Sequence, residues 1–447
     1  MYDLIVVGGG PGGYEAALHA GRLGKKVALI EKERLGGTCL NVGCIPTKTL
    51  LYSSKLFSKC REAASYGIRL RTPEFDLPAV VDRKNRVVSS LAKGVEGLLK
   101  RAGVKVISGH ARLVSRNTIE VDSTRHEATN ILIATGSRPA ALPIPGISSE
   151  HVFDSNSVFS LTSVPEKIAI IGGDYIGLEF ACFFNEIGSR VTVYEMAAQI
   201  TVGTDRDISS RLLQILTRSG IEFHLACRVL EIEGGRIHYA ASNGSKANAP
   251  ADFILNATGR VPLVNELGLE DVGIDFSPRG IRTSDQGKTN VSGVWACGDV
   301  TGRRMLAHAA TREGIVAVNN MFGKRDRIRY HAIPAVIYTH PEVASVGQSE
   351  EELKAKKIEY KKSLVPMATS GRFLIENETP AGIVKVLAGA RYGEILGVHA
   401  IGDLASEFIV AAAAMVETEM CVSAAREIIF PHPTVSEALR EAILRIQ

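Results

Sequence analysis

The sequence has no long apolar run, little net charge and no second close pair of cysteines, and each absence excludes a class of protein. The 447 residues carry a net charge of only +4. The one basic cluster, KAKKIEYKK at 354–362, is mixed with Glu and Tyr, which favours a solvated helix end over a nucleic-acid surface. The apolar run FIVAAAAMV at 408–416 is too short to span a bilayer, and the short apolar N-terminus passes directly into glycines, unlike a secretory signal. We therefore expect a cytoplasmic protein that binds neither nucleic acid nor a membrane.

Seven cysteines in so long a chain do not form the disulfide framework of a small secreted protein. The segment GGTCLNVGCIPTK, at 36–48, places Cys39 and Cys44 five positions apart. Five residues of regular helix rise about 7.5 Å and turn the side chains to different faces, so a bridge requires an irregular backbone. Asn41 and Gly43 lie between the cysteines and tolerate such a bend. A zinc site would need a second close ligand pair, whereas the other cysteines (60, 182, 227, 297 and 421) stand alone. The pair stays open as a redox disulfide, and we expect no metal.

The N-terminal residues form an apolar strand that ends in a glycine-rich turn. The sequence YDLIVVGGGPGGYEAALHAGRLGKKVALIEK predicts a strand ending at Gly8, a helix, and a second strand ending at Glu31. In such a unit, Gly8 makes the tight turn, Gly10 lets a pyrophosphate approach the backbone, and Gly13 packs the helix on the strand. The helix N-terminus faces the phosphates, and Glu31 would accept hydrogen bonds from ribose hydroxyls. The complete ordered set predicts a dinucleotide site.

The same pattern occurs again in KIAIIGGDYIGLEFACFFNEIGSRVTVYEM. Gly172 and Gly177 match the first and third glycines, and Glu195 lies 18 residues after Gly177, the same spacing as in the first copy. We call each of these strand–glycine turn–helix units a cradle. The segments ILIATGS (131–137) and FILNATGR (253–260) are equivalent strand ends, one for each cradle. The chain therefore contains two dinucleotide domains, the second inserted in the first, one for a flavin and one for a nicotinamide dinucleotide. Glu195 favours NAD, because the 2′-phosphate of NADP would meet a carboxylate.

Asp174 breaks the repeat, because it stands where the middle glycine is expected. Its side chain would crowd the phosphate path, and its charge would repel a phosphate by on the order of 4 kcal/mol at about 4 Å and an effective dielectric near 20. In the alternative interpretation, Asp174 turns out to solvent and has little effect.

The chain resembles the pyridine nucleotide–disulfide oxidoreductases, and within that family the dihydrolipoamide dehydrogenases. The resemblance rests on the two cradles together with the motifs GGTCLNVGC and, near the C-terminus, HPTVSEAL. The resemblance covers essentially the whole chain and includes ATGS, ACGDVTG, MLAHAA and YTHPEVASVG. It implies FAD and NAD as cofactors and a homodimer whose active sites combine residues of both subunits. Asp174 is the one clear departure from the family pattern.

The resemblance also implies an α/β fold with two Rossmann-like domains and a C-terminal α+β dimerisation domain. The FAD-binding domain would take residues 1–145 and 265–330, the inserted NAD-binding domain 146–264, and the dimerisation domain 331–447. Alternating stretches such as GIVKVLAG and EILGVHAIG are typical of the sheet in that last domain.

Roles for the cysteines and their neighbours follow from the resemblance. Cys39 would exchange with the substrate disulfide, and Cys44 would lie against the flavin as a charge-transfer thiolate. Lys48 would lie by the isoalloxazine ring and pair with Glu179, and Tyr175 would cover the nicotinamide pocket. The other cofactor positions carried over by motif are Ala111 at the adenine side, Ala134, Thr135, Gly136 and Ser137 of ATGS, Asp299 at the ribityl chain, Met305, Leu306, Ala307 and His308 along the flavin, and Val229 and Gly259 at NAD.

His432 precedes PTVSEALREAILRI, a predicted helix with an apolar face at Val435, Leu439, Ile443 and Ile446. Thr434 and Glu437 fit a capping box, which would be a purely structural role for Glu437. In the functional interpretation, Glu437 orients the His432 imidazole, which takes a proton from a dithiol. We expect only one of these roles to dominate, and the family motif favours the His–Glu pair. His340, in THPE, matches a structural family motif.

The expected function is FAD-dependent oxidation of protein-bound dihydrolipoamide with reduction of NAD. The partners would be the lipoyl-bearing domains of 2-oxo acid dehydrogenase or glycine cleavage systems. One alternative is a related NAD(P)H-dependent disulfide reductase with another small substrate. Glutathione-type relatives carry arginines near the position of Glu195, however, and mercuric reductases carry a C-terminal cysteine pair that is missing from LRIQ. A second alternative is a flavin-binding scaffold with weak NAD turnover, which only Asp174 supports.

Overall fold

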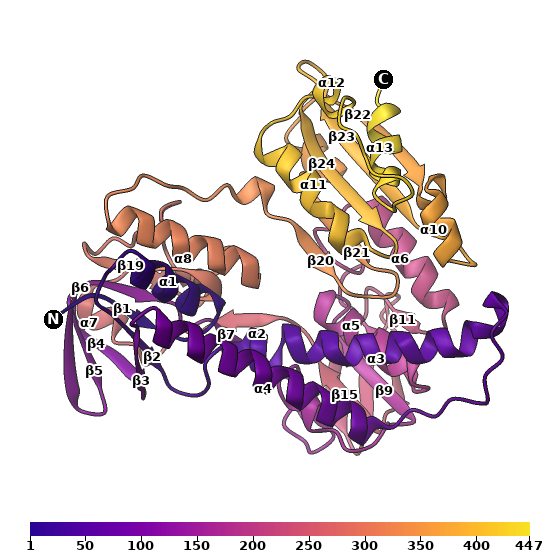
Figure 1. Cartoon of the computed structure of the whole chain (residues 1–447). Helices are drawn as coiled ribbons and strands as arrows, with labels where there is room; N and C mark the ends of the chain where they lie inside the picture. Colours follow the sequence, from indigo (N-terminus) through magenta and orange to yellow (C-terminus); the bar gives the residue numbers. More distant parts are fainter.

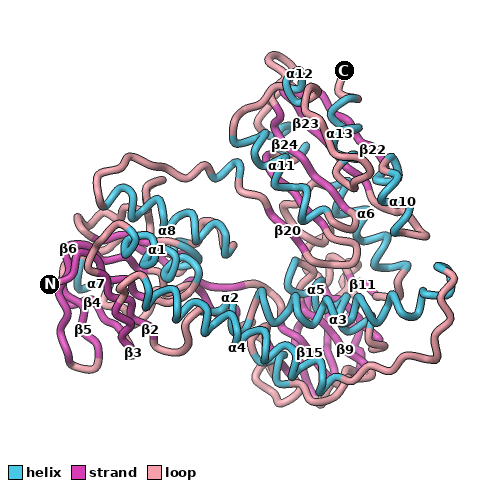
Figure 2. Tube along the Cα trace, viewed as in Figure 1, coloured by secondary structure: helices cyan, strands magenta, loops and turns pink.

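The structure is a computed structural model that describes all residues, 1–447. Its strands gather in three main sheets, with helices around each (Figures 1 and 2).

The first sheet is built around the N-terminal strand. Its strands are β1 (Tyr2–Val7), β2 (Val27–Glu31), β3 (Lys105–Ser108), β4 (Ala111–Ser115), β5 (Thr118–Val121), β6 (Thr124–Ile133) and β19 (Val294–Ala296). Their order is β3-β2-β1-β6-β5-β4, with β19 also paired to β6. The pairs among β3, β2, β1, β6 and β19 are parallel. Because both faces of β1 are covered, Leu4 to Val7 are all buried, as is usual for a parallel strand.

Helices cover one face of this sheet. They are α1 (Pro11–Arg22), α4 (Leu77–Arg101) and α8 (Ala307–Met321). Leu4 and Val6 share a core with Leu18 of α1, Leu99 of α4 and Val318 of α8. On the opposite face, the β4–β5 hairpin and the short α7 (Leu269–Val272) complete a second core.

The second sheet repeats this arrangement. Its strands are β8 (Val152–Asp154), β9 (Lys167–Ile171), β10 (Arg190–Tyr194), β11 (Glu222–His224) and β15 (Phe253–Asn256). The order β11-β10-β9-β15-β8 is parallel throughout. Packed against it are α5 (Tyr175–Glu186), α6 (Arg206–Arg218) and an antiparallel sheet of β12 (Arg228–Glu233), β13 (Arg236–Ala240) and β14 (Lys246–Pro250). The strand orders β3-β2-β1-β6 and β11-β10-β9-β15 correspond, as the sequence repeat predicts.

Two short elements connect these sheets. β7 (Ser137–Pro139) and β16 (Arg260–Pro262) follow the two strand ends that the sequence identified, and they pair with each other. α2 (Gly37–Val42) leads into α3 (Cys44–Glu62), which packs on both α4 and α5. Figure 1 shows α3 and α4 running from the first sheet to the second.

The third sheet is antiparallel and lies in the C-terminal part of the chain. Its strands are β20 (Ala335–Ile337), β21 (Val343–Gly347), β22 (Tyr360–Pro366), β23 (Ile383–Gly389) and β24 (Ile395–Ile401), in the order β20-β21-β24-β23-β22. The accompanying helices are α9 (Glu350–Ala355), α10 (Gly371–Glu376), α11 (Ala405–Glu417), α12 (Val422–Ala425) and α13 (Glu437–Leu444). The remaining short elements are β17 (Phe276–Ser277), β18 (Gly280–Ile281) and the 3₁₀ turns Ala63–Tyr66, Ser157–Ser160, Gly298–Thr301, Tyr330–Ala332 and Met367–Thr369.

Val435, Leu439, Ile443 and Ile446 are all buried, as predicted, although α13 itself is shorter than the predicted helix and contains only Leu439 and Ile443 of the four. The polar positions of β23 and β24 are buried as well, including Lys385 and His399. The reason is that α6 from the second sheet's domain packs on β24, so both faces of the third sheet are covered. No helix combines the length and the apolar character that crossing a membrane requires.

Candidate functional site

The backbone breaks between the two cysteines. Cys39 lies in α2, Gly43 ends that helix with φ −145° and ψ −111°, and Cys44 is the first residue of α3. A side chain at Gly43 would place its Cβ 2.9 Å from the Thr38 carbonyl oxygen, so this bend favours glycine. The irregular backbone that the spacing requires is therefore present.

Both cysteines are free thiols in the structure, and their side chains hydrogen-bond to each other. That bond, and next the positive charge of Lys48, lower the pKa of Cys44 to about 7 against the effect of burial. The same bond, together with burial, raises the pKa of Cys39 well above its usual value. Cys44 is therefore the sulfur that ionises first, and Cys39 keeps its proton.

Lys48 and Glu179 form an ion pair beside the cysteines. Lys48 lies one turn after Cys44 on α3, and its Nζ is 2.7 Å from Oε2 of Glu179 on α5. The Glu179 side chain is only 4% exposed, and its Oε1 accepts the backbone N–H of Tyr338 at 3.0 Å. The Lys48 ammonium also lies 4.8 Å from the centre of the Tyr338 ring. The pairing expected from the resemblance is present, and it joins three parts of the chain.

A cavity of about 740 Å³ connects the first glycine turn with the cysteines. The expected site residues that line it are Gly8, Gly10, Glu31, Cys39, Cys44, Lys48, Ala134, Thr135, Gly136, Ser137, Tyr175, Glu179, Asp299, Met305 and Ala307. Ala111 lines a neighbouring cavity together with Gly8 and Glu31. Gly13 lies under the turn, where a Cβ would be 1.9 Å from the Gly8 carbonyl oxygen. Leu306 and His308 do not line this cavity; His308 is bonded through Nε2 to the Pro334 carbonyl.

The first cradle has the shape that a dinucleotide needs. Gly8 has φ +106°, which favours glycine, and α1 begins at Gly10 without any side-chain cap. A Cβ at Gly10 would meet nothing closer than the Gly37 Cα at 4.0 Å, so the start of α1 is open to a phosphate. Glu31 is held by the Gly9 N–H at 2.7 Å and lines the cavity. A flavin dinucleotide fits this set of groups.

Arg260 is a cavity residue that the sequence reasoning missed. Its Nε donates to the Ser137 Oγ and its Nη2 to the Ser137 carbonyl, both at 2.8 Å. The Ser137 Oγ donates in turn to Asp299 Oδ2 at 2.5 Å, and burial raises the pKa of Asp299. The sequence repeat could have indicated Arg260 as a site residue, because it occupies in ATGR the place that Ser137 occupies in ATGS.

The second cradle reproduces the first with one difference. Gly172 has φ +111°, and Glu195 accepts the N–H groups of Gly173 and Ala197, both at 2.6 Å. Asp174 is exposed, and its Oδ1 accepts the Tyr175 N–H at 2.9 Å as the cap of α5. Three other positions were expected at NAD. Gly177 packs under Gly172, Val229 is buried in β12, and Gly259 follows β15 with φ +118°. None of these three residues lines the large cavity.

His432 and Glu437 are paired, but they do not line the cavity that contains the cysteines. The His432 Nδ1 is 2.9 Å from Glu437 Oε1, and the Thr434 N–H donates to Glu437 Oε2 at 3.0 Å. The predicted capping box is not formed, because α13 begins at Glu437 itself, with Ser436 as its N-cap and no side-chain cap. The expectation that only one contact of Glu437 could dominate is also wrong, because one carboxylate oxygen accepts the Thr434 N–H and the other pairs with His432. The His432 side chain is 78% exposed, so the single chain leaves its imidazole accessible.

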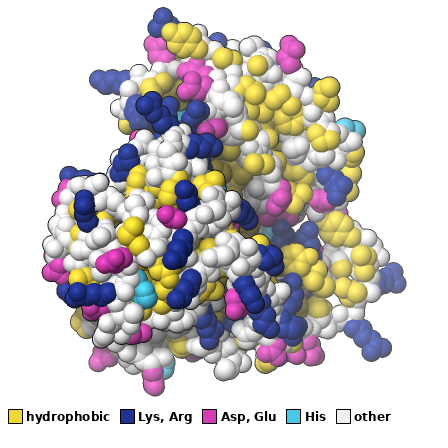
Figure 3. Space-filling view, turned by 60° about the vertical axis from the view of Figure 1, so that its left-hand side comes forward, with side chains coloured by type: hydrophobic (Ala, Val, Ile, Leu, Met, Phe, Trp, Pro, Cys, Tyr) yellow, Lys and Arg dark blue, Asp and Glu magenta, His cyan; other side chains and the backbone are white.

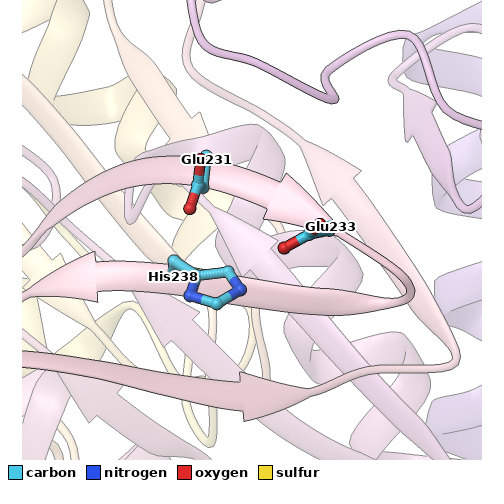
Figure 4. Close-up of side chains that lie close together, drawn as sticks. All are labelled: Glu231, Glu233 and His238. Carbon is cyan, nitrogen blue, oxygen red and sulfur yellow. The ribbon is translucent and has the colours of Figure 1, made fainter.

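A separate group of side chains that could bind a metal ion lies on the three-stranded sheet. Glu231 and Glu233 of β12 and His238 of β13 have their ligand atoms within 4.8 Å of one another (Figure 4). Glu231 is directly opposite His238 in the strand register. Both glutamates are exposed, and none of the three lines the large cavity. We assign no metal to this group.

The family of the chain follows from its match to known proteins. Residues 2–314 match the pyridine nucleotide-disulphide oxidoreductase family, and residues 333–443 match the dimerisation domain of that family. The chain belongs to this family and is an oxidoreductase. The C-terminal match also supports the expected homodimer.

Individual relatives cover nearly the full length. The chain is 40% identical to dihydrolipoyl dehydrogenase 3 of Pseudomonas aeruginosa, over 100% of this chain and 98% of that protein. It is 38% identical to dihydrolipoyl dehydrogenase of Bacillus subtilis, over 99% of this chain and 98% of that protein. The crystal structure of LpdA from Mycobacterium tuberculosis superposes with a TM-score of 0.91 at 26% identity, covering 99% of both chains. The predicted family, fold class and enzyme class are confirmed.

Proposed function

We propose that this chain oxidises dihydrolipoamide to lipoamide and reduces NAD, through a redox-active pair of Cys39 and Cys44. The observation that carries this function is the cysteine pair at the break between α2 and α3, where both residues line the large cavity. The lowered pKa of Cys44 supports it. The relatives named dihydrolipoyl dehydrogenase, at 38–40% identity over the full chain, support the same substrate.

FAD is the cofactor of the large cavity. When bound, it carries two electrons from the cysteine dithiol to NAD. The pyrophosphate would lie at the start of α1, where the backbone is open, and Glu31 would accept the ribose hydroxyls. Asp299 would hold the ribityl chain, and its bond from Ser137, which Arg260 supports, keeps its carboxylate in place. Lys48 would lie beside the isoalloxazine ring, oriented by Glu179.

The thiol chemistry conserves electrons and protons. One substrate thiol gives its proton to a base and its sulfur attacks Cys39 of the oxidised pair, the Cys39–Cys44 bond breaks, and Cys44 leaves as a thiolate, which suits its lowered pKa. The second substrate sulfur attacks the first and closes the lipoamide disulfide, and its proton passes to Cys39, which is released as a thiol. The cysteine pair has then gained the two electrons that the substrate has lost. Re-oxidation to the disulfide passes those electrons to NAD and releases a proton.

His432 is the base in this proposal. Glu437 holds its Nδ1, so that Nε2 is free to take the thiol proton and, once charged, to stabilise the thiolate. Because the single chain keeps this imidazole away from its own large cavity, His432 of the partner subunit serves the cysteines of the first subunit.

The dimer uses the apolar surface of the C-terminal domain. Figure 3 shows hydrophobic side chains gathered over the upper part of the molecule. In the C-terminal part of the chain, Leu404, Val410 and Ile429 are exposed, Ile429 to 93%. A groove of about 400 Å³ lined by Phe408, Val410, Met415, Ile429 and Phe430 continues this surface. Burying such a surface against a second copy is favourable, and it would cover the region next to His432.

The physiological partners are lipoyl-bearing domains of 2-oxo acid dehydrogenase or glycine cleavage systems, and the site of action is the cytoplasm. The domain boundaries that we propose are 1–145 and 265–330 for FAD, 146–264 for NAD, and 331–447 for dimerisation.

Anaerobic reduction of the flavin-loaded enzyme tests the role of the cysteines. Two electrons from dihydrolipoamide should produce a long-wavelength charge-transfer band from the Cys44 thiolate. Cys44→Ser should abolish the band, and Cys39→Ser should show it without reduction. A wild-type enzyme whose flavin bleaches directly, with no such band, would refute the redox pair. Steady-state rates with lipoamide and glutathione, using NAD(H) and NADP(H) in turn, separate this function from that of another disulfide reductase.

A further inference from the structure

The two cradles differ in what occupies the first turn of their helices. The N-cap of α1 is Gly10, which offers no side chain, whereas the N-cap of α5 is Asp174, whose carboxylate accepts the Tyr175 N–H at 2.9 Å. The remaining features correspond, including the positive φ of Gly8 and Gly172. The start of α5 therefore already carries an anion, at the place where the start of α1 is open.

This anion lies where a dinucleotide phosphate would bind. Unpaired N–H groups and the helix dipole make the first turn of such a helix the phosphate site of a Rossmann unit. The carboxylate of Asp174 has taken one of those N–H groups. A second carboxylate, Glu195, lies close enough to raise the pKa of Asp174 further after partial desolvation, which is the larger cause. Two carboxylates, those of Asp174 and Glu195, therefore lie beside the N-terminus of α5, where the phosphates of the nucleotide would bind.

The Asp174 side chain is free to leave this position. It is exposed to solvent, and its one side-chain hydrogen bond is to Tyr175. Glu195 differs, because both of its oxygens hold backbone N–H groups at 2.6 Å. The cap can therefore open by rotation about the Asp174 side chain, without moving the backbone of the cradle.

We propose that Asp174 is a resident anion of the NAD site, which the pyrophosphate of NAD(H) must displace before it binds. This inference rests on the proposed function, since it assigns NAD to the second cradle. Its consequence is weak binding of NAD and NADH alike, so that reduced product leaves quickly. The residue sets nucleotide affinity and takes no part in the thiol chemistry.

Isothermal titration of the flavin-loaded enzyme with NADH tests the proposal. Asp174→Asn keeps a cap of similar size and removes the charge, and it should lower the NADH dissociation constant by about tenfold. Asp174→Gly removes both charge and bulk and should lower it further. The gain from Asn should shrink at high salt, because the charge part is screened. ADP-ribose, which carries the pyrophosphate and no nicotinamide, should show the same order of affinities.

Asp76→Asn is the matched control. Asp76 also caps a helix, accepting the Ala79 N–H at 3.0 Å at the start of α4, but it lies in neither cradle. This variant should bind NADH as the wild type does. A tenfold gain in the control as well would show a general charge effect and overturn the proposal.

Equal NADH affinities in the wild type and both Asp174 variants would overturn the proposal, and so would weaker binding by Asp174→Asn. Weak or absent binding in the wild type that both variants restore would support it. Reduction of the wild-type flavin by dihydrolipoamide needs no NAD and reports on the proposed function separately. If that reduction fails, the function is wrong; if it succeeds and the NADH affinities are equal, only the role of Asp174 is wrong.

Discussion

Lys48 of α3 reaches Glu179 of α5 with 2.7 Å between Nζ and Oε2, although 131 residues separate them. The pair connects the helix that begins at Cys44 with the helix that begins at the second glycine turn. The Tyr338 N–H adds the start of the C-terminal domain to the same carboxylate. One buried glutamate thus fixes three segments around the cysteines.

We expect Lys48→Met to lower the stability of the fold and to make the Cys44 thiolate harder to form. The buried Glu179 would lose its cation, which should lower the free energy of unfolding by about 2–3 kcal/mol. The pKa of Cys44 should rise, because the Lys48 charge lowers it. Urea unfolding and a pH titration of the charge-transfer band measure the two effects. Lys48→Arg keeps the charge, so both its stability and the pKa of its Cys44 should change much less. Similar changes in the two variants would contradict the role of the charge.

The hydrogen bond between the cysteines should control which sulfur is ionised. Cys39→Ala removes the donor that is the largest cause of the lowered pKa of Cys44, whereas Cys39→Ser keeps an O–H donor. In the flavin-loaded enzyme, the charge-transfer band should therefore appear at higher pH in Cys39→Ala than in Cys39→Ser. In both variants the band should fade as the pH falls through the pKa of Cys44, because the thiolate is then protonated. Identical titrations would mean that the bond from Cys39 does not matter.

Glu437→Gln should separate the two contacts of this side chain. A glutamine has only one side-chain oxygen, so it can accept from Thr434 or from the His432 Nδ1–H but not from both, and its amide group would face the other donor. We expect dihydrolipoamide oxidation to slow by about 100-fold, with little change in thermal stability, since glutamine can still accept the Thr434 N–H. Steady-state rates and a thermal melt decide this. Full activity would leave Glu437 only with its contact to the Thr434 N–H.

Lys385 should be essential for joining the start of α6 to the third sheet. Its side chain is 1% exposed, and its Nζ lies within 2.6–2.9 Å of Asp205, Asp207 and Glu350. Lys385→Met leaves these carboxylates without their shared cation and should lower the free energy of unfolding by about 3–5 kcal/mol. Lys354 is the control, because it also pairs with Glu350 but is 61% exposed. Lys354→Met should barely change urea unfolding, and an equal loss in both variants would contradict the importance of burial.

The sequence alone predicted the features that depend on neighbouring residues. The turns at Gly8 and Gly172 take the positive φ that favours glycine, and the break at Gly43 separates the two cysteines. The last helix buries the predicted face. These features could be predicted because backbone preference and apolar periodicity act over a few positions of the chain.

Contacts between distant segments were decided by the packing of the three sheets. Neither spacing nor composition indicates that Arg260 bonds Ser137, 123 residues away, or that Lys385 is buried against Asp205 from another domain. The Lys48–Glu179 pair was expected only through the resemblance to a family. The shared role of Glu437 was missed because the sequence cannot show that its two oxygens point to different partners. Such contacts depend on how α3, α5 and the C-terminal sheet meet, which only the tertiary structure determines.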